Sequence, residues 1–104
     1  MDEERPQLDA LTSDDFSPRV GQAFRMRLNP EEWLELVLAE VHTHKYAPPN
    51  QQRRGFSLTF QSRLPGAAPQ ATYTLVHDEM GTMDLFLVPV GPKGGGMRYE
   101  AVFN

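Results

Sequence analysis

Two histidines separated by one residue, His42 and His44, are the first candidates for chemistry in this sequence. Alternate side chains of a β-strand point to the same face, so both imidazoles would lie on one side of a sheet, as a zinc site requires. His77, Asp78 and Glu79 could complete such a shell. However, His42 and His44 stand where a strand is expected to run into a loop, where polar residues are common. A metal site at these two histidines is therefore the weaker interpretation. We favour neither a metal ion nor any other cofactor for this protein.

The serines and acids do not form a recognisable hydrolytic site. Ser57 or Ser62 with His77 and Asp78 supplies the residue types of a triad, but no strained elbow of the form G-x-S-x-G is present. Neighbours such as His77 and Asp78 project to opposite faces of a strand and cannot act as a base and its orienting partner. We expect His77 to be a hydrogen-bonded residue at a strand end, and we predict that the protein is not an enzyme.

The sequence supports contact with another protein better than it supports a metal site or a catalytic site. In the segment 82–90, Leu85 and Leu87 point one way, while Phe86 and Val88 point the other. A strand that is apolar on both faces is usually covered on both, by the core and by a helix, a loop or a partner chain. We expect another part of the same chain, rather than a partner chain, to cover the second face of this strand, because large exposed apolar patches are rare on monomers. A basic pair precedes the strand over 55–62, and the candidate interaction patch is Arg53, Arg54, Phe86 and Val88.

The composition limits the classes of protein that fit. A length of 104 residues allows one domain, and the net charge of −4 has the wrong sign for a generic nucleic-acid-binding protein. The sequence has no apolar run long enough to span a membrane and no basic and apolar leader typical of secretion, so we expect a cytoplasmic protein. With no cysteine, disulfides and cysteine-ligated zinc are excluded.

Alternating apolar residues predict a mainly β fold, a small antiparallel barrel or sandwich of about six strands. A helix remains an alternative for one of these segments, 33–42. One short helix is expected to begin at Thr12 or Ser13, after a flexible acidic leader over 1–10, and a single β domain over 11–104. A long loop is expected over 43–54, and a flexible hairpin loop over 91–96. The predicted strands cover 22–28, 33–42, 55–62, 71–77, 82–90 and 97–103.

Four segments carry a resemblance to a known family: FSPRVGQAF (16–24), RRGFSLTF (53–60), PQATYTLVHDEMGTMDLFLVPVG (69–91) and RYEAVFN (98–104). Their order and content resemble a small, uncharacterised bacterial domain family of unknown function. The resemblance implies a compact, mostly β domain with no assigned catalytic residues. It also implies a place in a phage-tail-like or surface-appendage assembly.

These observations favour a non-enzymatic protein–protein interaction or assembly module, which binds a protein partner or another copy of itself. The alternative is a small-ligand or metal-binding β-barrel domain that uses the mouth of the barrel, with 43–54 and 91–96 as its rims. The two hypotheses differ in what the protein should bind: the apolar surface of another protein in the first, and a metabolite or metal ion in the second.

Overall fold

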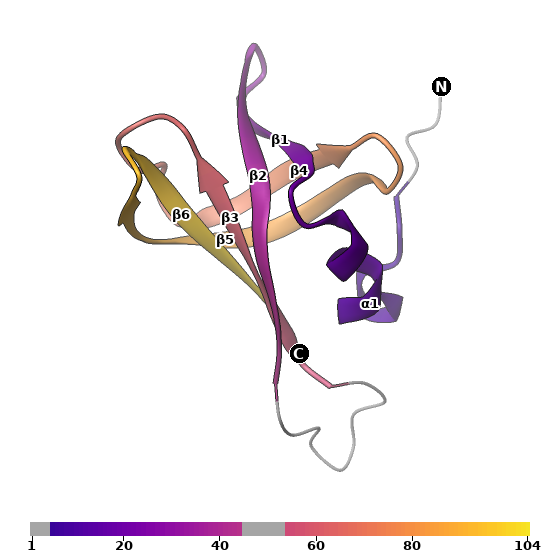
Figure 1. Cartoon of the computed structure of the whole chain (residues 1–104). Helices are drawn as coiled ribbons and strands as arrows, with labels where there is room; N and C mark the ends of the chain where they lie inside the picture. The colour runs from indigo at the N-terminus through magenta and orange to yellow at the C-terminus, as the bar shows by residue number, and fades with distance from the viewer. Residues whose placement is uncertain (1–4, 45–53) are drawn as a thin grey trace.

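The computed structural model describes residues 5–44 and 54–104. Six antiparallel strands close into a barrel in the order β1-β2-β3-β6-β5-β4 (Figure 1). The closed barrel confirms the predicted class and decides between barrel and sandwich. The elements are η1 (Leu8–Ala10), α1 (Ser13–Phe16), η2 (Ser17–Arg19), β1 (Ala23–Asn29), β2 (Glu32–Thr43), β3 (Phe56–Ser62), β4 (Ala71–His77), β5 (Gly81–Lys93) and β6 (Gly96–Phe103).

The segment 33–42 is a strand, which settles the choice between strand and helix. A tight turn joins β1 to β2, and the Asn29 side-chain oxygen accepts the backbone N–H groups of Glu31 and Glu32 at 3.0 and 3.1 Å. This turn returns the chain antiparallel to β1, with Phe24 opposite Leu36 in the register. Pairing with β1, and with β3 on the other side, satisfies the backbone hydrogen bonds that a helix would otherwise satisfy internally.

Strands β4, β5 and β6 form the predicted meander, and a hairpin turn joins β5 to β6 as expected, but it is shorter than the predicted loop over 91–96. Strand β5 continues to Lys93, which pairs directly with Gly96 at the start of β6. Only Gly94 and Gly95 turn, with φ of +60° and +83°. Two consecutive residues with positive φ match the twist of a hairpin, and glycine adopts them without strain. The glycines that suggested a mobile loop therefore make a tight turn.

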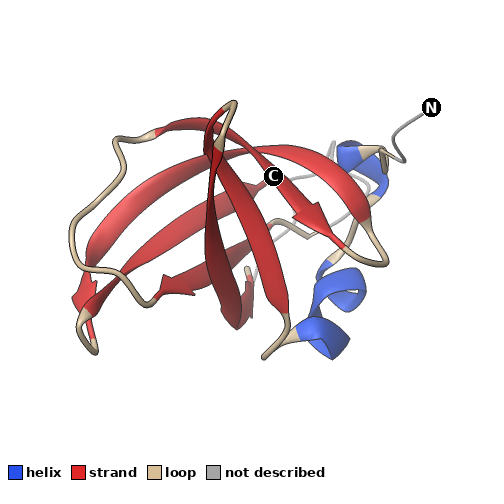
Figure 2. Cartoon of the chain, turned by 90° about the horizontal axis from the view of Figure 1, so that it is seen from above, coloured by secondary structure: helices blue, strands red, loops and turns tan. Residues whose placement is uncertain are grey.

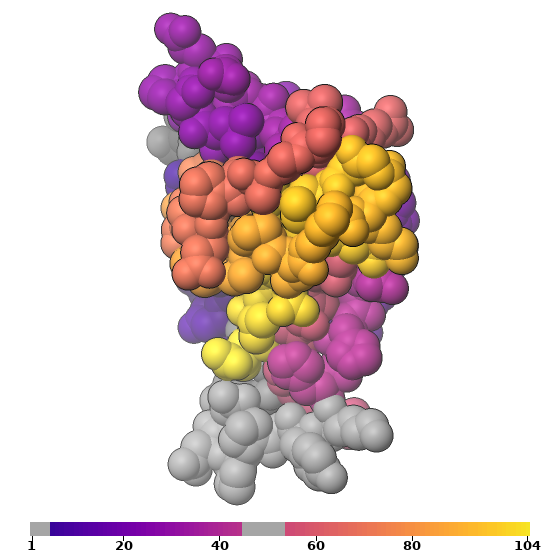
Figure 3. Space-filling model, turned by 90° about the vertical axis from the view of Figure 1, so that its left-hand side faces the viewer, coloured from indigo at the N-terminus to yellow at the C-terminus, as the bar shows by residue number. Residues whose placement is uncertain are grey.

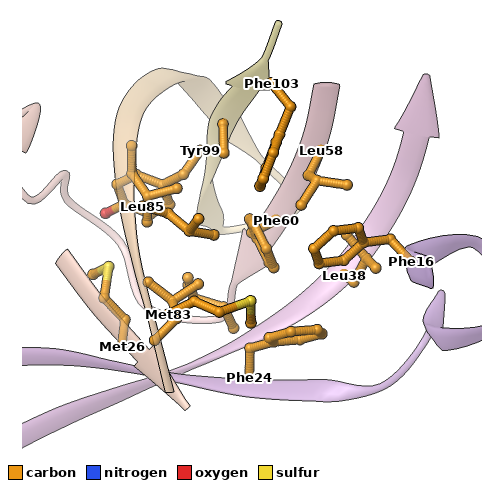
Figure 4. Close-up of a cluster of buried hydrophobic side chains, with 14 of the residues drawn as sticks. Phe16, Phe24, Met26, Leu38, Leu58, Phe60, Met83, Leu85, Tyr99 and Phe103 are labelled. Atoms are coloured by element: carbon orange, nitrogen blue, oxygen red, sulfur yellow. The ribbon is translucent and has the colours of Figure 1, made fainter. Parts of the chain in front are cut away.

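The inward side chains of all six strands fill the barrel (Figure 4). The inward side chains of β3 meet those of β6 in register: Phe56 lies opposite Phe103 and Phe60 opposite Tyr99. The barrel is therefore a packed core, and any binding site must lie at its ends or on its outer surface. The buried apolar residues are Phe16, Phe24, Met26, Leu36, Leu38, Phe56, Leu58, Phe60, Leu75, Met83, Leu85, Leu87, Tyr99, Ala101 and Phe103.

One end of the barrel is closed by the helical segment that precedes β1 (Figure 2). Helix α1 begins after Thr12, whose N–H donates to the Asp15 carboxylate at 2.7 Å, and this confirms the predicted helix start. The helix is short, yet it places the fully buried Phe16 ring against Phe56 and Phe103, with ring centroids 5.8 and 5.6 Å away. Phe16 thus covers this end of the core and excludes water from it.

The residues before α1 also contact the barrel. The Arg5 guanidinium lies 3.1 Å from the Asp84 carboxylate on β5, and Leu8 packs against the edge of the core. No helix in the described part of the chain is both long enough and apolar enough to cross a membrane.

Candidate functional site

The structure places one of the two histidines that were considered as metal ligands within β2 and the other just after it. His42 is exposed on the outer face of β2, opposite Ser57, whereas His44 lies beyond the end of the strand. The His44 backbone N–H donates to the Gly55 carbonyl at 2.8 Å. Among residues 5–44 and 54–104, no group of three or more His, Cys, Asp or Glu side chains is placed to hold a metal ion.

His77 is held in a single tautomer by hydrogen bonds at both ring nitrogens. Its Nδ1 accepts the backbone N–H groups of Glu79 and Met80 at 3.1 and 3.2 Å, so the proton is on Nε2, which donates to the Gln22 side-chain oxygen at 2.7 Å. The ring also packs on Phe24, with centroids 4.6 Å apart. Both nitrogens are occupied, so His77 stabilises the β4–β5 turn, as the hypothesis of a hydrogen-bonded residue at a strand end predicted.

Burial lowers the pKa of His77, and the positive charge of Arg19 lowers it further, while Glu79 and Asp78 act in the opposite direction. The imidazole is therefore neutral at physiological pH. A neutral ring whose acceptor nitrogen is already bonded cannot take up a proton from a substrate without breaking the turn. This geometry assigns His77 a structural role.

The predicted interaction patch is only partly covered by the described residues. Arg53 lies outside them, and Arg54 is exposed just before β3. Phe86 is 53% exposed and Val88 is half-buried. We expected another part of the same chain to cover this face of β5, but none of the described residues buries Phe86. Val90, farther along β5 at the bulge between Pro89 and Gly91, is 51% exposed.

Strand β6 extends this exposed face. The β5–β6 pairing ends at Val88 and Glu100, and beyond that point the two strands separate. Phe86 and Val102 flank the separation and line a hollow of about 330 Å³ between the strands. Val102 is 55% exposed. We call the exposed apolar side chains Phe86 and Val102 the β5–β6 face; strands β5 and β6 lie in the orange and yellow part of the surface in Figure 3.

A second apolar hollow lies at the barrel end opposite Phe16, beneath the β3–β4 connection (63–70). In Figure 3 this connection lies between the β1–β2 hairpin and strands β5 and β6. The hollow has a volume of about 470 Å³, and none of its lining residues is charged. We call it the barrel-end pocket; it is lined by Leu28, Leu34, Leu64, Pro65, Gly66, Ala67, Ala68, Pro69, Tyr73 and Tyr99.

Two tyrosines hold the β3–β4 connection over this pocket. The Tyr99 hydroxyl accepts the Ala68 backbone N–H at 2.9 Å, and the Tyr73 hydroxyl donates to the Pro69 carbonyl. Burial raises the pKa of Tyr73, and the nearby Tyr99 raises it further, so Tyr73 stays protonated and keeps its donor at neutral pH. The connection is thereby anchored at two successive residues.

The sequence patterns did not indicate this pocket. Tyr99 alternates with Met97, Ala101 and Phe103 in the segment 97–103, a pattern that predicts a core position and no pocket. The expected rims also differ: 91–96 contributes no lining residue, and residues 45–53 lie outside those described. The sequence feature that could have indicated the pocket is a tyrosine at an inward position among aliphatic residues and phenylalanines, because a buried hydroxyl needs a hydrogen-bond partner.

The comparison with family models matches residues 11–103 to the family described as Domain of unknown function (DUF6916). The chain belongs to this family. The match includes all six strands and α1, and it confirms the resemblance to an uncharacterised domain family. No curated protein and no solved structure matches the chain.

Proposed function

We propose that this DUF6916 domain is a non-enzymatic protein–protein interaction module whose contact surface is the β5–β6 face. The observation that supports it most directly is the exposure of Phe86, 53%, and Val102, 55%, on two strands that border one hollow. Large side chains left half in water on neighbouring strands are a common feature of surfaces that become covered on association.

The hollow beside Phe86 and Val102 gives this face a shape that a partner can fill. It is lined by Leu85, Ala101 and Phe103 from the barrel wall and by Leu8 from the N-terminal segment. An apolar side chain inserted there would bury surface on both strands, and anchors of this kind supply most of the binding energy in protein interfaces.

Charge around the face defines the partner further. Asp9 is exposed and lines the hollow, and Glu100 is half-buried at the end of the β5–β6 pairing. Acidic groups at the rim favour a partner segment that carries apolar residues flanked by Lys or Arg, because complementary rim charges steer association. A repeated subunit of a phage-tail-like or surface-appendage assembly, as the resemblance implies, is the setting that we propose for this contact.

The test compares three forms of the full chain. In the face variant, Phe86→Ser and Val102→Ser are combined; in the control variant, Val20→Ser and Leu64→Ser remove two exposed apolar side chains elsewhere, 48% and 60% exposed. Size-exclusion chromatography with light scattering measures self-association at increasing concentration. Quantitative pull-down from the native host measures capture of other proteins.

We expect the wild type and the control variant to self-associate or to retain a partner to the same extent, and the face variant to lose that contact. Circular dichroism must show that all three forms are folded. The proposal is wrong if the face variant and the control variant behave alike in both measurements.

A further inference from the structure

The Tyr99 hydroxyl has a hydrogen-bonding capacity that the fold leaves unused. Tyr99 is 1% exposed, and its ring lies in the buried cluster, with the hydroxyl oxygen at the edge of that cluster (Figure 4). The oxygen accepts the Ala68 N–H, but within the described residues its own proton has no acceptor. A phenol can both donate and accept, so the Tyr99 proton remains available to an acceptor oxygen of a molecule bound in the hollow.

The lining of the barrel-end pocket restricts what that acceptor can belong to. Side chains from β1, β2, β4 and β6 meet the β3–β4 connection there, and all of the lining is aliphatic, prolyl, glycyl or phenolic. A charged ligand would lose its hydration without gaining an ion-pair partner, which is costly. The volume of about 470 Å³ lies within the range of small-molecule sites. The surroundings therefore select an uncharged and largely apolar molecule.

We propose that the barrel-end pocket binds an uncharged, largely apolar small molecule with one acceptor oxygen, such as a ketone or ester carbonyl, which receives the hydrogen bond of Tyr99. The apolar part lies among Leu28, Leu34 and Leu64. This site is distinct from the β5–β6 face, since the two surfaces share no lining residue. Either proposal can fail without the other.

The probes are two molecules with the same seven-carbon chain, 2-heptanone and heptanoate, titrated into the full chain at pH 7.5 and followed by two-dimensional NMR. We expect 2-heptanone to produce saturable shifts at Leu28, Leu64 and Ala68. Heptanoate carries a charge into a site without a counter-charge, so we expect it to bind at least about tenfold more weakly.

Paired tyrosine variants test the hydrogen bond. Tyr99→Phe removes the donor, and we expect the affinity for 2-heptanone to fall about three- to tenfold. Tyr73→Phe is the matched control, because it removes the anchor at Pro69 on the same connection and leaves Tyr99 in place. We expect it to change the affinity less than about twofold. The comparison separates loss of the donor from loosening of the connection.

A third variant keeps the test decisive if Tyr99→Phe does not fold. Leu28 lines the pocket and is 40% exposed, so Leu28→Lys can place a positive charge at the rim without disturbing the core. We expect this variant to bind heptanoate more tightly than 2-heptanone, the reverse of the wild type. The proposal is overturned if the lining residues show no saturable shift with 2-heptanone, if the wild type binds both probes equally, or if a folded Tyr99→Phe variant binds 2-heptanone as the wild type does.

Discussion

Gly96 lies directly against the Ser62 carbonyl, and a Cβ atom on Gly96 would overlap that oxygen. Gln61 and Met97 bond to Ser62 at the same place: the Gln61 amide donates to its carbonyl at 2.8 Å, and the Met97 N–H donates to its hydroxyl at 3.0 Å. The end of β3 and the start of β6 are thus joined so closely that only glycine fits.

We therefore expect Gly96→Ala to destabilise the barrel by at least about 1–3 kcal/mol, because backbone must move to admit one methyl group. Chemical denaturation measures the loss. Gly94→Asn is the control: Gly94 has φ of +60° and open space where a side chain would begin, and asparagine tolerates such a φ, so this variant should remain within about 0.5 kcal/mol of the wild type. Equal losses in the two variants would contradict the close approach.

The stability of the protein should fall as the pH decreases below about 6.5, because the pKa of His77 is lower in the folded chain than in the unfolded chain. The unfolded chain then takes up a proton that the folded one excludes, so the stabilisation is complete above the unfolded pKa. Denaturation at pH 7.5, 6.5 and 5.5 measures the dependence. His77→Gln should be less stable at pH 7.5 by about 1–3 kcal/mol, because Glu79 and Met80 lose their acceptor, and its stability should vary less with pH. An unchanged pH dependence in His77→Gln would assign the effect to other groups.

Phe16 should contribute strongly to stability although its helix has only four residues. Its ring is fully buried against Phe56 and Phe103, so Phe16→Ala should cost about 3–5 kcal/mol in chemical denaturation. Val20 follows in the same N-terminal region and is 48% exposed, so Val20→Ala should change stability by no more than about 0.5 kcal/mol. If the two changes cost the same, Phe16 does not seal the barrel.

Adjacent residues of β5 should respond differently to truncation. Leu87 is fully buried, and Leu87→Ala should cost about 2–5 kcal/mol. Phe86 is the larger side chain but faces outward, so Phe86→Ala should cost only about 0.5 kcal/mol. A thermal-unfolding series on both variants checks this. A large loss for Phe86→Ala would mean that its face is covered within the chain and would remove the basis for the β5–β6 face.

The sequence by itself determined the strands. Phe56, Leu58 and Phe60 alternate with polar residues, and a period of two is a local property that needs no knowledge of the rest of the chain. The helix start at Thr12 was equally local, because a cap involves side chains and backbone groups within three residues. Their confirmation follows from this short range.

Only the tertiary structure decided how the strands close and where sites form. The barrel closes because β1 pairs with β4 at Arg25–Val76 and Met26–Leu75, residues about fifty positions apart, and no local pattern records that pairing. The barrel-end pocket likewise needs parts of β1, β2, β4 and β6 to meet beneath the β3–β4 connection. The alternation in β5 predicted two apolar faces, but whether the Phe86 face is buried depends on what packs against it. Such contacts are set by the whole fold, since chain closure brings together residues whose local sequences carry no information about one another.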